Sequence, residues 1–156
     1  MSIEVRELDL DAPGTAEAIV VLQRASYRVE ADLLGARTLP ALKESPRRLR
    51  RTRERFLGAF EGERLVGAVS WKRTGALVDV HRLVVHPDRF RRGIAGLLLD
   101  ALEEREGDAE RSIVATGAAN APARRLYERR GFTAVEEHLA AGSITIVTYE
   151  KRSARR

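Results

Sequence analysis

The chain contains no cysteine. This absence excludes a disulfide scaffold, a zinc–thiolate site, an iron–sulfur site and a cysteine nucleophile. No apolar run approaches the roughly 20 residues that a membrane helix needs, so we expect no contact with a membrane. The first six residues have neither the basic start nor the apolar run of a secretion signal, and we therefore expect a cytoplasmic protein. The three histidines are scattered and lack a carboxylate cluster, so we predict no metal site.

Lysine is also scarce, since only three of the 28 basic residues are lysine and the other 25 are arginine. The arginines concentrate in residues 47–55 and 152–156, and the net charge is +5. A basic surface attracts nucleic acid or another polyanion, including a phosphorylated cofactor. No aromatic residue interrupts the arginine clusters, which argues against binding of single-stranded nucleic acid. We interpret the clusters as a solvated helix face and a basic C-terminal tail.

The length of 156 residues suits one domain, and 44% hydrophobic residues are enough for a core. No repeat or long linker divides the chain. We predict a single domain over residues 1–150 and a basic tail over residues 151–156.

Apolar residues alternate with polar ones in some segments and recur at helical spacing in others. The predicted strands are Ile3–Arg6, Phe56–Phe60, Leu65–Trp71, Leu77–Val85, Ile113–Ala115, Thr133–Leu139 and Ser143–Tyr149. The predicted helices are Ala16–Gln23, Pro40–Arg55 with a break at Pro46, Ile94–Glu106 and Ala121–Arg130. This order, β-α-α-β-β-β-α-β-α-β-β, predicts an α/β fold with a mixed central sheet of about seven strands and helices on both faces.

A basic turn joins the strand that ends before His86 to the next helix. The first N–H groups of a helix have no partner within the helix, and its dipole adds positive potential there. Gly93 and Gly96 let a ligand approach the backbone, and Arg91 and Arg92 suit a pyrophosphate. The turn lacks both the dinucleotide fingerprint and the P-loop pattern. It predicts an anion site, and the alternative is a helix start that needs glycine for its turn.

A second pattern lies at the start of the last helix. Asn120 is a suitable cap, Pro122 fits the first turn, and Tyr127 follows two turns later. The same residues would also suit a capped amphipathic helix with a tyrosine in the core.

Three segments occur in a telling order: Leu-x-Val-x-Pro at 83–87, Arg-Arg-Gly-Ile-Ala at 91–95, and Asn-x-x-Ala-x-x-Leu-Tyr-x-x-x-Gly-Phe at 120–132. Together they resemble the GNAT superfamily of acyl-CoA-dependent N-acyltransferases, and the predicted element order is similar to that fold over nearly the whole chain. Two positions depart from the family pattern. Phe90 stands where the family usually has Gln or Arg, and Ala95 replaces the second glycine.

The resemblance implies that the chain binds acetyl-CoA as acyl donor. The backbone of Leu83, Val84 and Val85 would pair with the pantetheine arm like an added strand. Asn120 would contact the cofactor, and the Tyr127 hydroxyl would lie near its sulfur. The pyrophosphate would bind to the N–H groups of Arg91, Arg92, Gly93, Ile94, Ala95 and Gly96.

The implied reaction is transfer of an acetyl group to a primary amine of a small molecule or peptide, by direct attack on the thioester. An N–H group near Val85 would stabilise the oxyanion, and Tyr127 would give the leaving thiolate its proton. Asp79 and His81 are the candidate bases, and the residues do not choose between them. Lying two apart on one strand, both are expected on the same face as Leu83 and Val85.

The resemblance implies an acceptor pocket built by the first helices and the last hairpin. Between the first two helices lie Tyr27, Arg28, Glu30 and Asp32, which could face it. Glu30 and Asp32 would suit a cationic amine, whereas Arg28 would suit a carboxylate, so the acceptor stays open. Trp71 is expected in the core.

Two other functions fit the sequence. The first is a non-catalytic module of the same fold that binds or senses acyl-CoA. The second is nucleic-acid binding through the arginines of residues 47–55. A homodimer through the last strands is a further hypothesis.

Overall fold

The computed structural model describes residues 2–35, 43–140 and 144–153. Its centre is a sheet of seven strands in the order β1-β2-β3-β4-β5-β7-β6. The strands are β1 (Ile3–Glu7), β2 (Arg55–Glu61), β3 (Arg64–Thr74), β4 (Leu77–Val85), β5 (Arg111–Gly117), β6 (Thr133–Ala140) and β7 (Ile144–Arg152). The β4–β5 pair is parallel and the other neighbouring pairs are antiparallel. The predicted mixed sheet is therefore confirmed.

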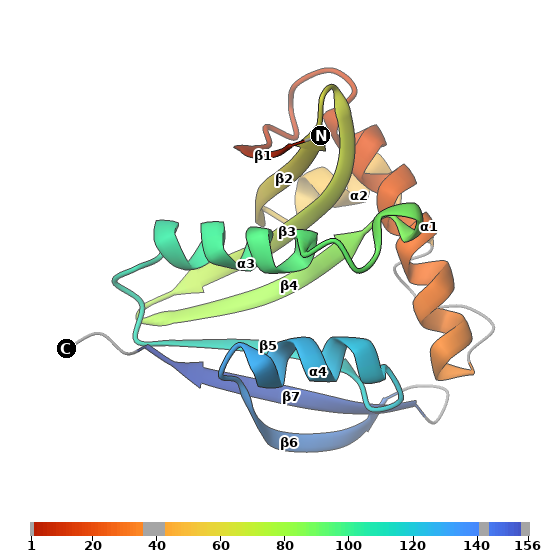
Figure 1. Ribbon diagram of the computed structural model, residues 1–156. Coiled ribbons are helices and arrows are strands. Elements are labelled where there is room, and N and C mark those ends of the chain that lie inside the picture. Colours follow the sequence, from red (N-terminus) through yellow and green to blue (C-terminus); the bar gives the residue numbers. More distant parts are fainter. Residues whose placement is uncertain (1, 36–42, 141–143, 154–156) are drawn as a thin grey trace.

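Helices cover both faces of this sheet (Figure 1). They are α1 (Thr15–Leu34), α2 (Pro46–Arg51), the short 3₁₀ turn η2 (Pro87–Arg89), α3 (Ile94–Arg105) and α4 (Ala121–Arg129). Leu98 of α3 and Tyr127 of α4 belong to the main core. Ile19 of α1 packs with Leu49 of α2 in a second cluster on the other face. The predicted α/β class is confirmed. No helix in the described ranges is long and apolar enough to cross a membrane.

The first helix is much longer than predicted. The sequence indicated a helix over residues 16–23, but α1 runs for 20 residues and ends at Gly35, which has a left-handed φ of 68°. The sheet-facing positions continue at helical spacing through Tyr27, Ala31 and Leu34, so packing extends the helix beyond its first apolar run. Residues 27–32 consequently lie within α1 and not between two helices.

The second helix is shorter than the predicted Pro40–Arg55. Pro46 does not break it but opens it, because the first turn needs no N–H donor. The Ser45 hydroxyl caps this end by accepting the Arg48 N–H at 3.2 Å. The chain then turns at Arg53, whose φ is 59°, and enters β2. Residues 40–42 of the predicted helix lie outside the described residues.

The last strands also extend past their predicted ends. β7 continues to Arg152, so Lys151 and Arg152 belong to the sheet and not to the tail predicted for residues 151–156. Ser143 and residues 154–156 lie outside the described residues. β6 forms an edge of the sheet. A dimer through this edge stays a prediction.

Trp71 is fully buried, as predicted, and anchors the far end of α3. Its indole N–H donates to Oε2 of Glu106 at 2.7 Å. Arg55 and Arg73 donate to the same carboxylate at 3.1 and 2.8 Å. The side chain of Glu106 is only 7% exposed. One carboxylate beyond α3 thus holds donors from β2 and β3.

Replacement of this carboxylate tests its contribution to stability. Glu106→Ala should lower the free energy of unfolding by about 3 kcal/mol, because two arginines and a buried indole N–H lose their acceptor. Glu104→Ala, at an exposed position of α3, is the matched control and should change it by less than about 0.5 kcal/mol. Urea denaturation measures both. Equal effects of the two variants would contradict the assignment.

Candidate active site

β4 contains a bulge. Ser70 of β3 lies opposite Arg82, but the next residue, Trp71, lies opposite Val80, which leaves His81 as an extra residue in β4. A bulge interrupts the alternation of side chains along a strand and bends it. Here it brings the consecutive side chains of His81 and Arg82 onto one face.

This bulge corrects one prediction about the site. Leu83 and Val85 pack in the core shared with α3 and α4. His81 instead approaches Glu54, which precedes β2 on the side of α2. Asp79 and His81 do share a face, but it is opposite to that of Leu83 and Val85, because the extra residue shifts the alternation.

The sheet opens directly after the bulge. The parallel pairing of β4 with β5 ends at Val80 opposite Val114. β4 continues to Val85 and β5 to Gly117. Figure 1 shows the two strands diverging toward α1. The facing edges of residues 81–85 and 115–117 are therefore not paired with each other.

Backbone groups of β4 point into this opening. The His86 N–H donates to the Val66 carbonyl of β3 at 2.8 Å. Because antiparallel hydrogen bonding alternates along a strand, the N–H and C=O groups of Leu83 and Val85 point away from β3. They face the opening, which gives an extended ligand a strand edge to pair with.

The turn before α3 presents further free donors. Arg91 and Gly93 have φ values of 65° and 75°, and Gly93 is the N-cap without a side-chain capping bond. Within the described ranges, none of the N–H groups of residues 91–96 donates to a backbone carbonyl. The side chains of Arg91 and Arg92 are exposed. Free N–H groups at a helix start beside two guanidinium groups suit a phosphate anion. Phe90, 42% exposed, is not part of the core.

The start of α4 lies at the same opening. Asn120 caps the helix, since its Oδ1 accepts the Ala123 N–H at 3.2 Å. The ring of Tyr127 is buried, with ring centroids 5.7 Å from Phe132 and 5.8 Å from Tyr149. Burial raises the pKa of Tyr127, so its phenol keeps its proton at neutral pH.

The C-terminal half of α1 covers the opening. The Leu34 side chain lies so close to Gly117 that a Cβ there would sit 2.3 Å from its Cδ2. Tyr27 packs against the cluster that joins α1 to β3 and β4. Of the four residues predicted for the acceptor pocket, Tyr27 and Glu30 face the sheet. Arg28 and Asp32 are exposed.

A charged network that the sequence did not predict lies beneath α1. Arg82 donates to Gln23 at 3.1 Å, to Glu54 at 2.7 Å and to Glu44 at 3.0 Å. The Ser70 hydroxyl donates to Glu54 at 2.6 Å. Burial opposes the charge on Glu44 and Glu54. The hydrogen bonds that each carboxylate accepts, together with the positive charge of Arg82, outweigh burial and hold both pKa values below the usual range. Both carboxyl groups are thus ionised at neutral pH.

The two predicted bases touch each other beside this network. His81 Nε2 lies 3.3 Å from Asp79 Oδ2, and His81 Nδ1 lies 3.4 Å from Glu54 Oε2. The imidazole therefore stands between two carboxylates. Which group acts as a base stays a prediction.

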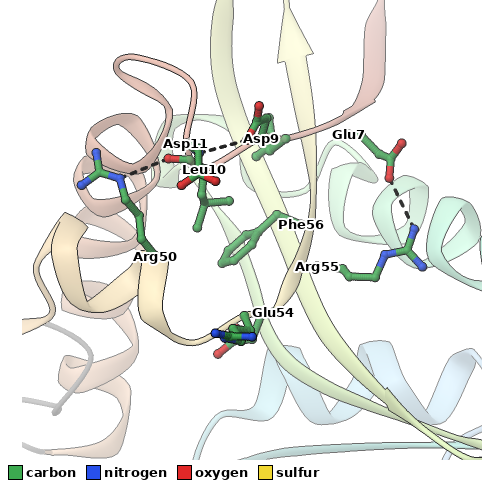
Figure 2. Close-up of a pocket in the computed structure, with 10 residues that line it drawn as sticks. Glu7, Asp9, Leu10, Asp11, Arg50, Glu54, Arg55 and Phe56 are labelled. Atoms are coloured by element: carbon green, nitrogen blue, oxygen red, sulfur yellow. Dashed lines mark hydrogen bonds and ion pairs between the residues drawn. The ribbon is translucent and has the colours of Figure 1, made fainter.

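A surface pocket of about 460 Å³ lies elsewhere, between the segment after β1, α2 and the start of β2 (Figure 2). Several charged groups at this pocket have partners. Arg55 pairs with Glu7 at 3.4 Å, and Arg50 donates to the Leu10 carbonyl at 3.2 Å. None of the predicted site residues lines the pocket. The opening between β4 and β5, bordered by the free edge of residues 83–85 and by the segment that leads from β5 into α4, is the candidate active site.

Residues 35–153 match the family model described as "Acetyltransferase (GNAT) domain". The chain belongs to the GNAT acetyltransferase family. A curated relative, UPF0157 protein YqkA of Bacillus subtilis (strain 168), is 34% identical over 134 residues, which are 86% of this chain. The chain spans 39% of that relative's length.

Solved structures show the same fold. The PaiA N-acetyltransferase of Thermoplasma acidophilum, in complex with coenzyme A, superposes with a TM-score of 0.78 at 23% identity, covering 97% of this chain and 99% of that one. The ribosomal-protein-S18-alanine N-acetyltransferase of Escherichia coli gives a TM-score of 0.81 at 14% identity, with coverages of 99% and 96%. GNAT acetyltransferases of low sequence identity thus share the fold along nearly the whole chain.

The contribution of the charged network can be tested by measuring the free energy of unfolding as a function of pH. Arg82→Met should lower the free energy of unfolding by about 3 kcal/mol at neutral pH, because two carboxylates lose their cation. In the wild type, the network's stabilisation is present above the ordinary carboxyl pKa of 4.5 and is lost as pH falls through the lower folded values. The deficit of the variant should therefore persist down to about pH 4.5 and shrink as pH falls below that value.

Urea denaturation across this pH range measures the effect. Arg50→Met, which removes a more exposed arginine paired with Glu17, is the control and should cost less than about 1 kcal/mol. A deficit that does not change with pH would speak against the paired carboxylates.

Proposed function

We propose that the chain transfers an acetyl group from acetyl-CoA to a primary amine. The observation that carries this proposal is the presence, among the described residues, of two sets of backbone groups without a backbone partner. One set is the unpaired N–H groups of residues 91–96, and the other is the open edge of β4 at residues 83–85. A ligand with a pyrophosphate followed by an amide-containing arm has the chemistry to use both sets.

The described residues fit this donor. The N–H groups of residues 91–96, with Arg91 and Arg92, would hold the pyrophosphate. The Leu83 and Val85 backbone would pair with the pantetheine arm as an added strand. The coenzyme A bound by the Thermoplasma protein of the same fold supports this choice. Asn120 would contact the donor near its acyl end.

The proposed chemistry is direct attack of the neutral amine on the thioester carbonyl. The Val85 N–H, which points into the opening, would stabilise the oxyanion. Tyr127 would give its phenolic proton to the departing sulfur, and its raised pKa supports this role because the group stays protonated before the reaction. Asp79 and His81 remain the bases proposed from the sequence.

The acceptor is proposed to be a primary amine of a small molecule or peptide. A cytoplasmic location, a homodimer and the absence of a nucleic-acid partner stay predictions from the sequence. A module that senses acyl-CoA without turning it over would share the donor site, and the role of Tyr127 separates the two functions.

Donor binding can be tested by thermal unfolding. Acetyl-CoA at about 100 times its dissociation constant should add roughly 2.7 kcal/mol to the free energy of unfolding. The double variant Arg91→Met/Arg92→Met should weaken this affinity at least about tenfold, because charge-assisted bonds to phosphate are lost. Arg129→Met, at an exposed position near the end of α4, should leave the affinity unchanged. A wild-type protein that acetyl-CoA does not stabilise would refute the proposed donor site.

The role of Tyr127 can be tested by removing its hydroxyl. Tyr127→Phe should lower turnover roughly 100-fold, since a positioned acid is lost, while the ring keeps its packing and acetyl-CoA affinity persists. Tyr149→Phe is the matched control. Its hydroxyl is engaged by Arg124 and Glu128, so this variant should lose stability but keep its turnover. Full activity of Tyr127→Phe would remove the phenol from the mechanism.

A further inference from the structure

The surface pocket beside α2 is separate from the opening between β4 and β5, and we call it the α2 pocket. Residues 7–11, residue 50 and residues 53–56 line it (Figure 2). Its volume of about 460 Å³ is typical of sites for small molecules. The proposed acetyl transfer uses none of these residues, so the pocket has a role of its own to explain.

Part of the lining is apolar. Phe56 is buried, and Leu8 and Leu10 pack against the cluster to which it belongs. Figure 2 shows the side chains of Leu10 and Phe56 pointing toward each other. A ligand in the α2 pocket would therefore lie against hydrocarbon on one side.

Three charged groups of the lining have no ion-pair partner within the described ranges. They are the carboxylates of Asp9 and Asp11 and the guanidinium of Arg53. Asp9 uses one oxygen, Oδ1, to accept the Asp11 N–H at 3.0 Å. The remaining charged groups of the lining are all paired, in Glu7–Arg55, Arg50–Glu17 and Glu54–Arg82. Two negative charges and one positive charge are thus left for a ligand.

Arg53 has a backbone conformation that few arginines adopt. Its φ of 59° lies in the left-handed region, which glycine and asparagine enter more easily. The side chain is exposed, and no hydrogen bond of its guanidinium is found among the described residues. Strained backbone at a non-glycine residue is frequent at functional sites. A turn alone would be formed more easily by glycine, which indicates a role for the guanidinium.

We propose that the α2 pocket binds a free basic α-amino acid such as lysine. Its α-carboxylate pairs with Arg53, and its two ammonium groups pair with Asp9 and Asp11. The methylene chain between the charges lies on the apolar part of the lining. The ligand thus matches the unpaired charges of the pocket in number and in sign. A lysine within a polypeptide lacks the α-ammonium or the α-carboxylate, so the three charges together select the free amino acid.

The pocket adjoins the charged network through one residue. Glu54 lines the pocket, and its carboxylate accepts from Arg82 at 2.7 Å and lies 3.4 Å from His81 Nδ1. The bound amino acid therefore lies next to the side chains of the β4 bulge without entering the opening. The site is distinct from both the donor site and the acceptor site of the proposed acetyl transfer.

Thermal unfolding of the intact chain with lysine and its analogues tests the charge assignment. Cadaverine lacks the α-carboxylate of lysine, 6-aminohexanoate lacks the α-ammonium, and L-norleucine lacks the side-chain ammonium. L-lysine should raise the melting temperature in a saturable way. Each analogue should bind at least about tenfold more weakly, because one charge-assisted contact is lost. Sodium chloride at matched ionic strength is the control for screening. No saturable shift with lysine, or an analogue that binds as well as lysine, would overturn the proposal.

Variants of the lining show which side chains make these contacts. Because asparagine adopts a positive φ more readily than arginine, Arg53→Asn should melt no lower than the wild type, and it should bind lysine only as weakly as cadaverine. Asp11→Asn should bind lysine at least about tenfold more weakly than the wild type does. Arg47→Asn, which removes an exposed arginine of α2 outside the pocket, should keep the wild-type affinity.

An unchanged lysine affinity in Arg53→Asn would contradict the assigned site, whatever the wild type binds. The acetyl-CoA shift of the wild type is measured separately. Its absence would refute the proposed acetyl transfer and leave the α2 pocket unaffected, because the two sites share no residue.

Discussion

The single extra residue in β4 is the constraint on which the site depends. The bulge at His81 shifts the alternation of side chains, so that His81 and Arg82 face α1 and α2 while Leu83 and Val85 enter the main core. Pairing with β5 ends just before it, at Val80. A bulge bends its strand and strengthens the local twist, which separates the strand from its neighbour. The open strand edge and the buried charged network therefore share one local cause.

Backbone groups form one side of the opening, and side chains form the other. The proposed donor side consists of backbone groups, namely the N–H groups before and within the first turn of α3 and the free edge of β4. The proposed acceptor side consists of side chains on α1, among them Tyr27 and Leu34. Backbone donors are present whatever side chain a residue carries, whereas the side chains along α1 change with each substitution. Solved structures share this fold with the chain at 14% and 23% identity.

Sequence reasoning succeeded where the signal is local. The start of α3 at Gly93 and of α4 at Asn120 rests on capping and turn chemistry within a few residues, and both were predicted. It failed where distant segments decide. The bulge in β4 is defined only by its pairing with β3, and the length of α1 depends on the sheet beneath it.

The same limit applies to the side chains of the site. Arg82 is 59 positions from Gln23 and 38 from Glu44 in the chain, and no short pattern reports such a cluster. Glu30 was named as a pocket residue, but its difference from Asp32 appears only once α1 is placed against the sheet. Burial, and not residue type, separates these two carboxylates.

The carboxylate of Glu106 has a consequence for motion along α3. It binds donors from β2 and β3 just beyond the last turn of the helix, whereas the first turn ends in N–H groups without backbone partners. Local opening of a helix is easiest where hydrogen bonds are few and packing is light. Hydrogen exchange should therefore be slow near the C-terminal end of α3 and fast at its start. The helix is fixed at its C-terminal end, so its first turn can move without loosening the core.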